Sequence, residues 1–133
     1  MKRELLLSAD PIDEPALTAS RVLSSSMGAA ITFSGVVRGL EQDAPIGGID
    51  YTAFVPMAEA QFHRLFDEAS RRWPLESIRL VHRLGWVRVG EASLWVEVIA
   101  PHRGEAFAAC QWLIDEMKRV VPIWKRAAES LQP

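Results

Sequence analysis

The sequence has very little cysteine and no long apolar run. A single cysteine, Cys110, excludes an internal disulfide and any metal centre built from several cysteines, and it is typical of a reducing compartment. No stretch approaches the roughly 20 apolar residues that a membrane span requires. The apolar run at residues 5–7 is too short for a secretion signal. These absences predict a soluble, cytoplasmic protein with no membrane partner.

The chain also lacks an excess of charge of one sign and a cluster of histidines. Its 15 lysines and arginines nearly balance 17 aspartates and glutamates, so the formal net charge is −2. That balance argues against a nucleic-acid partner. His63, His82 and His102 fall on separate predicted elements without the spacing of metal ligands, and we expect neither a metal nor a cofactor. Any basic site must therefore arise where a few side chains converge.

The remaining pattern is that of a globular domain. Of the 133 residues, 49% are hydrophobic and 24% are charged, which predicts one domain (1–133) with its own core. Alternation and helical periodicity predict strands at 4–8, 29–38, 49–55, 77–89 and 92–100, helices at 13–23, 56–73 and 101–121, and an extended tail. This order predicts an α+β fold with a largely antiparallel sheet, two long helices and a short N-terminal helix.

Two local features of the predicted strands bear on the site. The strand at 29–38 alternates with period two, which predicts Phe33 and Val37 on one face and Arg38 on the face opposite Phe33. Glycine-bearing residues 39–48 then form a polar loop. His82 alternates with Leu80 and is expected to be a half-buried, hydrogen-bonded residue of its strand.

The helix at 101–121 is the longest predicted element. Its apolar residues recur at steps of three and four and predict one buried face, formed by Phe107, Cys110, Ile114, Met117 and Val121. Cys110 on this face is a core residue by expectation, because a reactive thiol needs exposure and nearby positive charge.

Pro122 ends this helix, because it lacks an N–H donor and disfavours helical geometry at the preceding residue. Lys118 lies off the buried face, and Lys125 follows the break. A chain that turns back at Pro122 brings the two lysines together, which predicts an anion site. Lysines and arginines near a helix C-terminus also suit the helix dipole, so an ordinary structural role stays open.

His102 and Arg103 occupy the other end of the helix, where a cation opposes the dipole. An exposed arginine at a helix start is also common. Arg103 and Lys118 are separated by about 22 Å along the axis, so they cannot reach one small ligand from one straight helix. Either they serve different sites, or a second, antiparallel copy brings its Arg103 to this Lys118 in a two-fold dimer.

Eight short motifs follow one another over about residues 29–126. They are FSGVVR at 33–38, MAE at 57–59, RWPL at 72–75, HRLG at 82–85, VGE at 89–91, APHR at 100–103, AF at 106–107, and VPIWK at 121–125 after Lys118. Each motif is weak alone, but the ordered set is specific, and it resembles that of the MoaE family, the catalytic (large) subunits of molybdopterin synthase. The resemblance implies an α/β-hammerhead-like version of the predicted fold.

The resemblance further implies a sulfurtransferase of molybdenum cofactor biosynthesis. The sulfur donor would be the C-terminal Gly-Gly thiocarboxylate of a small ubiquitin-like carrier subunit. The acceptor would be cyclic pyranopterin monophosphate, which gains the dithiolene of molybdopterin. The family assembles as a heterotetramer with a homodimer of large subunits at its centre.

The family's pocket positions map onto Val36, Val37, Arg38, His102, Arg103, Lys118, Lys125 and Arg126. We expect Lys118 to be the principal acid/base or covalent contact with the carrier terminus, and Lys125 its catalytic partner. Ala127 stands where the family usually has a glutamate. A non-catalytic paralogue that binds the carrier, or a small phosphate- or nucleotide-binding regulator, would share the cationic residues but not the reaction.

Overall fold

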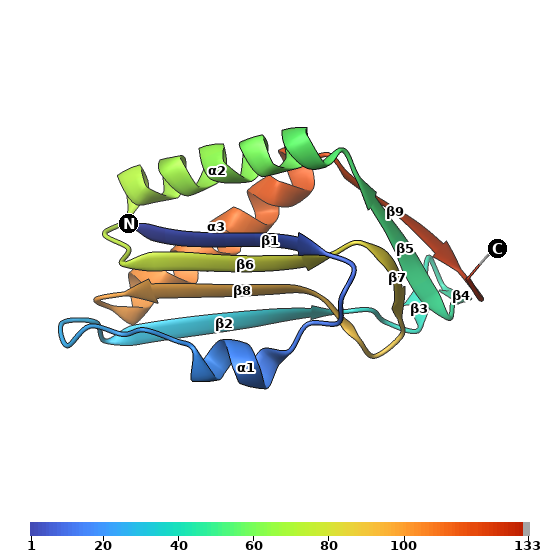
Figure 1. Cartoon of the computed structure of the whole chain (residues 1–133), viewed down its shortest axis with the longest axis horizontal. Coiled ribbons are helices and arrows are strands. Elements are labelled where there is room, and N and C mark those ends of the chain that lie inside the picture. Colours follow the sequence, from blue (N-terminus) through green and yellow to red (C-terminus); the bar gives the residue numbers. More distant parts are fainter. Residues whose placement is uncertain (132–133) are drawn as a thin grey trace.

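The protein, for which a computed structural model describes residues 1–131, folds into a four-stranded sheet, a three-stranded sheet, a two-stranded hairpin and three helices (Figure 1). The elements are β1 (Lys2–Ser8), α1 (Glu14–Ala19), β2 (Ala29–Val36), β3 (Leu40–Glu41), β4 (Ala44–Pro45), β5 (Gly48–Ala53), α2 (Val55–Arg72), β6 (Ser77–Arg83), β7 (Gly85–Arg88), β8 (Ala92–Ala100), α3 (Arg103–Val120) and β9 (Ile123–Ala128). The α+β class, the two long helices and the short N-terminal helix are confirmed.

The larger sheet has the strand order β1-β6-β8-β2. Only the β1–β6 pair is parallel; the β6–β8 and β8–β2 pairs are antiparallel. Helices α2 and α3 pack on one face of this sheet (Figure 1). No helix among residues 1–131 is long and apolar enough to cross a membrane.

Helix α2 follows its sequence pattern closely. Pro56 lies in the first turn, where its missing N–H costs no hydrogen bond. Its buried residues, Ala58, Phe62, Leu65, Phe66 and Ala69, lie on one face, as the helical periodicity of this stretch predicts. Each large side chain among them contributes about 1.5–3 kcal/mol relative to exposure. The helix ends at Arg72, before Pro74.

Helix α3 is rotated relative to the predicted stripe. Its buried residues are Ala106, Ala109, Cys110, Leu113 and Met117. Phe107, predicted to be buried, is 57% exposed, so that prediction is wrong. The alanines bring the helix close to the sheet, and their small side chains give a weak hydrophobic signal in the sequence. Cys110 is buried as predicted, and burial raises the pKa of its thiol to about 11.

A second sheet, ordered β7-β5-β9, crosses the end of the first toward which β1, β6 and β2 run (Figure 1). It refines two predictions. The predicted strand 77–89 is divided into β6 and β7 at Gly85, whose φ of +83° bends the chain into the second sheet. The extended tail is a full strand, β9, paired with β5. Residues 39–48, predicted as a loop, include the small β3–β4 hairpin.

Helix α1 is shorter than the predicted 13–23 and ends at Ala19. The chain leaves the helix because its backbone and side chains bind the sheet. Arg79 of β6 donates to the carbonyl oxygen of Leu17 and to Oγ of Ser20, and Arg21 forms an ion pair with Glu97 of β8. These contacts hold residues 17–21 against the face of the sheet opposite α3.

Candidate active site

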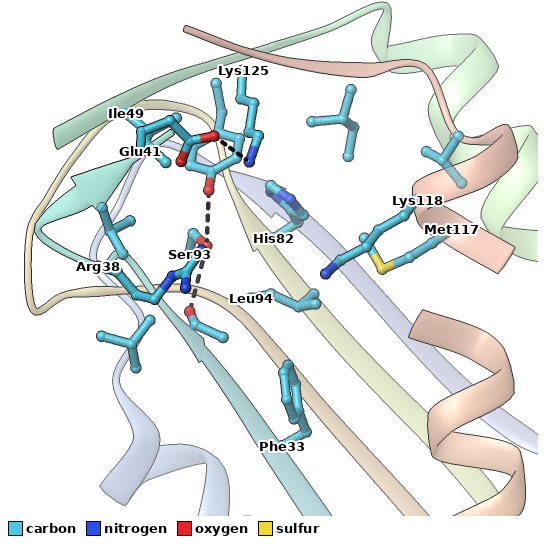
Figure 2. Close-up of a pocket in the computed structure, with 16 residues that line it drawn as sticks. Phe33, Arg38, Glu41, Ile49, His82, Ser93, Leu94, Met117, Lys118 and Lys125 are labelled. Carbon is cyan, nitrogen blue, oxygen red and sulfur yellow. Dashed lines mark hydrogen bonds and ion pairs between the residues drawn. The ribbon is translucent and has the colours of Figure 1, made fainter. Parts of the chain in front are cut away.

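A cavity of about 430 Å³ lies where α3 ends and the two sheets meet (Figure 2). Its wall takes residues from β2, β3, β5, β6, β8, α3 and β9. The titratable side chains that line it are Arg38, Glu41, Tyr51, His82, Lys118 and Lys125. Three cations therefore face one carboxylate in a partly enclosed space.

Arg38 reaches the cavity from beyond the end of a strand. Strand β2 ends at Val36, so its alternation no longer sets the direction of Arg38. At that end the register of β2 against β8 shifts between Gly35 and Val36, because the extra residue of a β-bulge, Ser93, belongs to β8. Phe33 and Arg38 consequently line the same cavity, and the predicted opposite faces are wrong. Val37 after the bulge is fixed by backbone bonds to Glu91 and Gly90.

The break at Pro122 brings Lys118 and Lys125 to the same cavity, as the sequence predicts. Helix α3 ends at Val120, and Val121 caps it in extended geometry. The chain then enters β9, where Lys125 is paired with Tyr51 of β5. Lys118 from the helix and Lys125 from the strand both line the cavity (Figure 2).

The three cavity cations differ in how far they are neutralised. Nζ of Lys125 lies 3.3 Å from Oε1 of Glu41, a carboxylate carried by the β3–β4 hairpin. Arg38 and Lys118 form no ion pair with any residue in the described part of the chain (Figure 2). The cavity therefore has a surplus of positive charge suited to an anionic ligand.

His82 is a cavity residue that the sequence reasoning did not assign to the site. It is only 5% exposed, and the ring of Tyr51 packs edge-on against it with centroids 5.1 Å apart. Nδ1 lies 2.7 Å from the carbonyl oxygen of Arg83 and donates to it, because a carbonyl can only accept. Burial lowers the pKa of His82, against the smaller opposing effect of that hydrogen bond. The alternation Leu80–His82 signals the correct face but not the cavity at the end of the strand.

Not all predicted site residues meet in one subunit. Val36, Val37, Arg38, Lys118 and Lys125 line the cavity. Arg126 is outside this set and forms an ion pair with Asp50 at 3.5 Å, because successive residues of a strand point to opposite faces.

His102 and Arg103 lie at the opposite end of α3. His102 is the N-cap residue, and both side chains are exposed. The helix of 18 residues is about 27 Å long, so this pair cannot line the same cavity. Whether a second copy brings them there stays a prediction.

The fold and the cavity define an α+β protein with a cationic pocket at the junction of two sheets. The family model described as "MoaE protein" matches residues 7–120, and the chain belongs to the MoaE family. Among relatives, the molybdopterin synthase catalytic subunit of Emericella nidulans is 38% identical over 112 residues, which are 84% of this chain and 57% of the relative. The corresponding subunit of Pyrococcus abyssi is 41% identical over 105 residues, which are 79% of this chain and 71% of the relative. The match thus spans little more than half of the Emericella relative.

Solved structures give the same picture of the fold. Molybdopterin synthase from Staphylococcus aureus superposes with a TM-score of 0.84 at 28% identity, over 97% of this chain and 92% of that chain. A complex of subunits 1 and 2 of the molybdopterin-converting factor from Helicobacter pylori matches with a TM-score of 0.71 at 22% identity, over 94% and 83% of the two chains. At this lower identity, the second match supports the fold alone.

Proposed function

We propose that this chain is a molybdopterin synthase catalytic subunit. It transfers sulfur from the C-terminal thiocarboxylate of a small ubiquitin-like carrier to cyclic pyranopterin monophosphate and forms the dithiolene of molybdopterin. The observation that carries the proposal is the convergence of Arg38, Lys118 and Lys125 on one cavity. Family membership and the names of the relatives support it. The reaction takes place in the cytoplasm, where the carrier and the pterin are the partners.

The charges of the cavity suit both reactants. The pterin carries a phosphate and the carrier ends in a thiocarboxylate, so each brings negative charge to a cavity that has a surplus of cations. Arg38 offers the planar set of donors that binds phosphate in two-point contacts. Lys118, which has no carboxylate partner among the described residues, is free to bind the carrier's terminal acyl group.

The reaction has two halves for each sulfur. In the first, the sulfur of the thiocarboxylate attacks a carbon of the pterin side chain, the bond from that carbon to oxygen breaks with its electron pair leaving on the oxygen, and the acyl group of the carrier becomes linked to the pterin through sulfur. In the second, water attacks the acyl carbon, the carbon–sulfur bond breaks, and the carrier leaves with an ordinary carboxylate. Lys118 donates hydrogen bonds to the acyl oxygen as negative charge develops there, and Lys125 holds the anion beside it.

The unusual residue at position 127 does not argue for the non-catalytic alternative. Ala127 is paired with Ile49 and packs against the small cluster formed by Val37, Ile49 and Val87. It is not among the residues that line the cavity. The replacement of the family's glutamate therefore leaves the cationic groups of the site in place.

The decisive experiment mixes this protein with thiocarboxylated carrier and the pterin precursor and measures dithiolene formation. Lys118→Ala should lower the rate about 100-fold or more, because it removes a donor to the developing charge. Its free energy of unfolding should change by less than about 0.5 kcal/mol, since the side chain is exposed. Arg119→Ala is the matched control, because Arg119 is the next residue and is bound to Glu116. Equal activity of wild type and Lys118→Ala would refute the assigned mechanism.

The proposal includes a homodimer at the centre of a heterotetramer, with His102 and Arg103 of one subunit completing the cavity of the other. Arg103→Ala and Lys118→Ala subunits, each inactive alone, should recover about a quarter of wild-type activity when mixed. Half of the randomly formed dimers are mixed, and each mixed dimer has one intact site of two. Absence of recovery, with subunit exchange shown by mass measurement, would exclude a shared site.

A further inference from the structure

The cavity holds a buried imidazole that the reaction as described above does not use. His82 comes from β6, in the middle of the main sheet, and its ring reaches the cavity wall. Figure 2 shows the ring on the cavity side of its strand, in the same part of the cavity as Lys118 and Lys125. A polar side chain at this depth is costly unless its hydrogen bonds are satisfied.

The surroundings fix the ring in one tautomer. The Nδ1–H group donates to the carbonyl oxygen of Arg83 at 2.7 Å, so in the neutral ring the lone pair belongs to Nε2. The edge-on contact with Tyr51 restrains rotation of the ring. Burial also lowers the pKa of His82, which favours the neutral form near neutral pH. The imidazole is therefore held as a proton acceptor.

The other titratable groups of the cavity cannot take this role as they stand. Arg38, Lys118 and Lys125 are cations by character and have no lone pair to offer when charged. Glu41 is engaged by Lys125 at 3.3 Å. The hydroxyl of Tyr51 donates to Oγ of Ser93 at 3.3 Å. Among the titratable cavity residues that the structure describes, His82 alone combines a neutral form with a free lone pair basic enough to accept a proton near neutral pH.

We propose that His82 is the general base of the second half of the reaction, an inference that rests on the proposed function. Water forms a bond from its oxygen to the acyl carbon of the carrier and gives one proton to Nε2. The carbon–sulfur bond then breaks, and its electron pair stays on the sulfur, which remains on the pterin as a thiolate. The released carboxylic acid ionises to solvent, and His82 returns its proton to the thiolate or to water.

The two halves of the reaction should depend on His82 differently. The thiocarboxylate is already an anion, so its attack needs no base. Water at neutral pH is a poor nucleophile, and a positioned base accelerates its attack by about 10²–10⁴-fold. Loss of the base should therefore spare the formation of the covalent carrier–pterin thioester and slow its hydrolysis.

The test is a single-turnover experiment with the full-length protein, thiocarboxylated carrier and the pterin precursor, followed by intact-mass measurement of the carrier. In His82→Gln the thioester adduct should accumulate, with hydrolysis slowed about 100-fold or more and adduct formation changed less than threefold. The matched control is His63→Gln, because His63 is exposed on α2 and lies outside the cavity-lining set. It should behave as wild type.

The pH profile separates proton transfer from a structural role. Hydrolysis of the wild-type adduct should slow as pH falls, because protonated His82 accepts no proton, and this acidic limb should vanish in His82→Gln. If His82→Gln slows both halves equally and keeps the limb, the residue is structural and the inference fails. If His82→Gln does not fold, the wild-type profile alone decides. Because burial lowers the pKa of His82, the rate of adduct hydrolysis is followed from pH 8 down to the lowest pH at which the protein stays folded, and a flat rate over that whole range overturns the inference. Absence of both adduct and dithiolene with wild type would instead refute the proposed function.

Discussion

Charged side chains cluster at two places in this molecule, one on each side of the main sheet. In one cluster the charges are paired with one another, and in the other most are not. Under α1, Glu97 is 1% exposed and accepts hydrogen bonds from both Arg79 and Arg21, at 2.8–3.0 Å. Burial would raise the pKa of Glu97, but the hydrogen bonds and charges of the two arginines outweigh it and lower the pKa. Every charge there has a partner.

The cavity on the other side reverses this arrangement. Of its three cations, Arg38, Lys118 and Lys125, only Lys125 contacts the single cavity carboxylate, that of Glu41, and this contact joins two partly exposed side chains. Buried charge without compensation would destabilise the fold, whereas exposed charge without compensation costs little and leaves the site open to a ligand. The comparison teaches that the pairing of charges within a cluster, and not the number of charges, separates a structural cluster from a binding cluster.

Among the substitutions considered, loss of the Glu97 carboxylate should have the largest effect. Glu97→Gln keeps the shape of the side chain but leaves Arg79 buried without its counter-charge, so the free energy of unfolding should fall by about 3–5 kcal/mol, measured by urea denaturation. Glu116→Gln removes one partner of an exposed pair with Arg119 and should cost at most about 1 kcal/mol. Equal losses in the two variants would show that the buried cluster is not structural.

Acid should also weaken the cluster formed by Glu97, Arg79 and Arg21, because it protonates Glu97. The pKa of Glu97 is lower in the folded protein than its ordinary value of 4.5, so between these values the unfolded chain binds more protons. The stabilisation is therefore complete above about pH 4.5 and declines as pH falls through the lower, folded value. Glu97→Gln should flatten this decline in denaturation curves between pH 3 and 6. An unchanged slope would assign acid sensitivity to other carboxylates.

The smallest expected effect is on the affinity of the cavity for an anion. Glu41→Gln removes the one carboxylate that occupies Lys125, so affinity for an anion should rise by up to about fivefold, the equivalent of an exposed ion pair. Titration calorimetry with inorganic phosphate measures this directly. Asp43→Asn is the matched control, because Asp43 lies two residues away in the hairpin turn, outside the cavity, and asparagine tolerates its φ of 64°. Weaker phosphate binding by Glu41→Gln would give Glu41 a binding role.

Sequence periodicity predicted the elements that pack against one another and failed where geometry is set by distant partners. The stripe of α2 and the stop at Pro122 follow from local chemistry, and both were correct. The early end of α1 was missed because contacts of Leu17, Ser20 and Arg21 with the sheet decide it. The exposure of Phe107 was missed because alanines, not large residues, face the sheet.

The candidate site was predictable in its lysines and less so in its geometry. Lys118 and Lys125 follow from one helix and one break, so their meeting could be inferred. Arg38 lies two residues beyond the end of β2, where strand alternation no longer sets the direction of a side chain, so alternation alone placed it wrongly. His82 looked like an ordinary strand residue, because nothing in its neighbours along the chain reveals that the sheet ends beside a cavity.

The pairing of β9 with β5 has a consequence for the nascent chain. Helix α2, the main sheet and most of α3 are synthesised before Lys125 emerges from the ribosome, and together they contain the main core cluster. A translation intermediate can therefore bury its apolar surface and resist proteolysis while its cavity still lacks one wall and one lysine. The capacity to bind an anionic ligand therefore depends on a residue that follows the core in the chain, because Lys125 comes just after Val121, the last buried residue of the main core cluster.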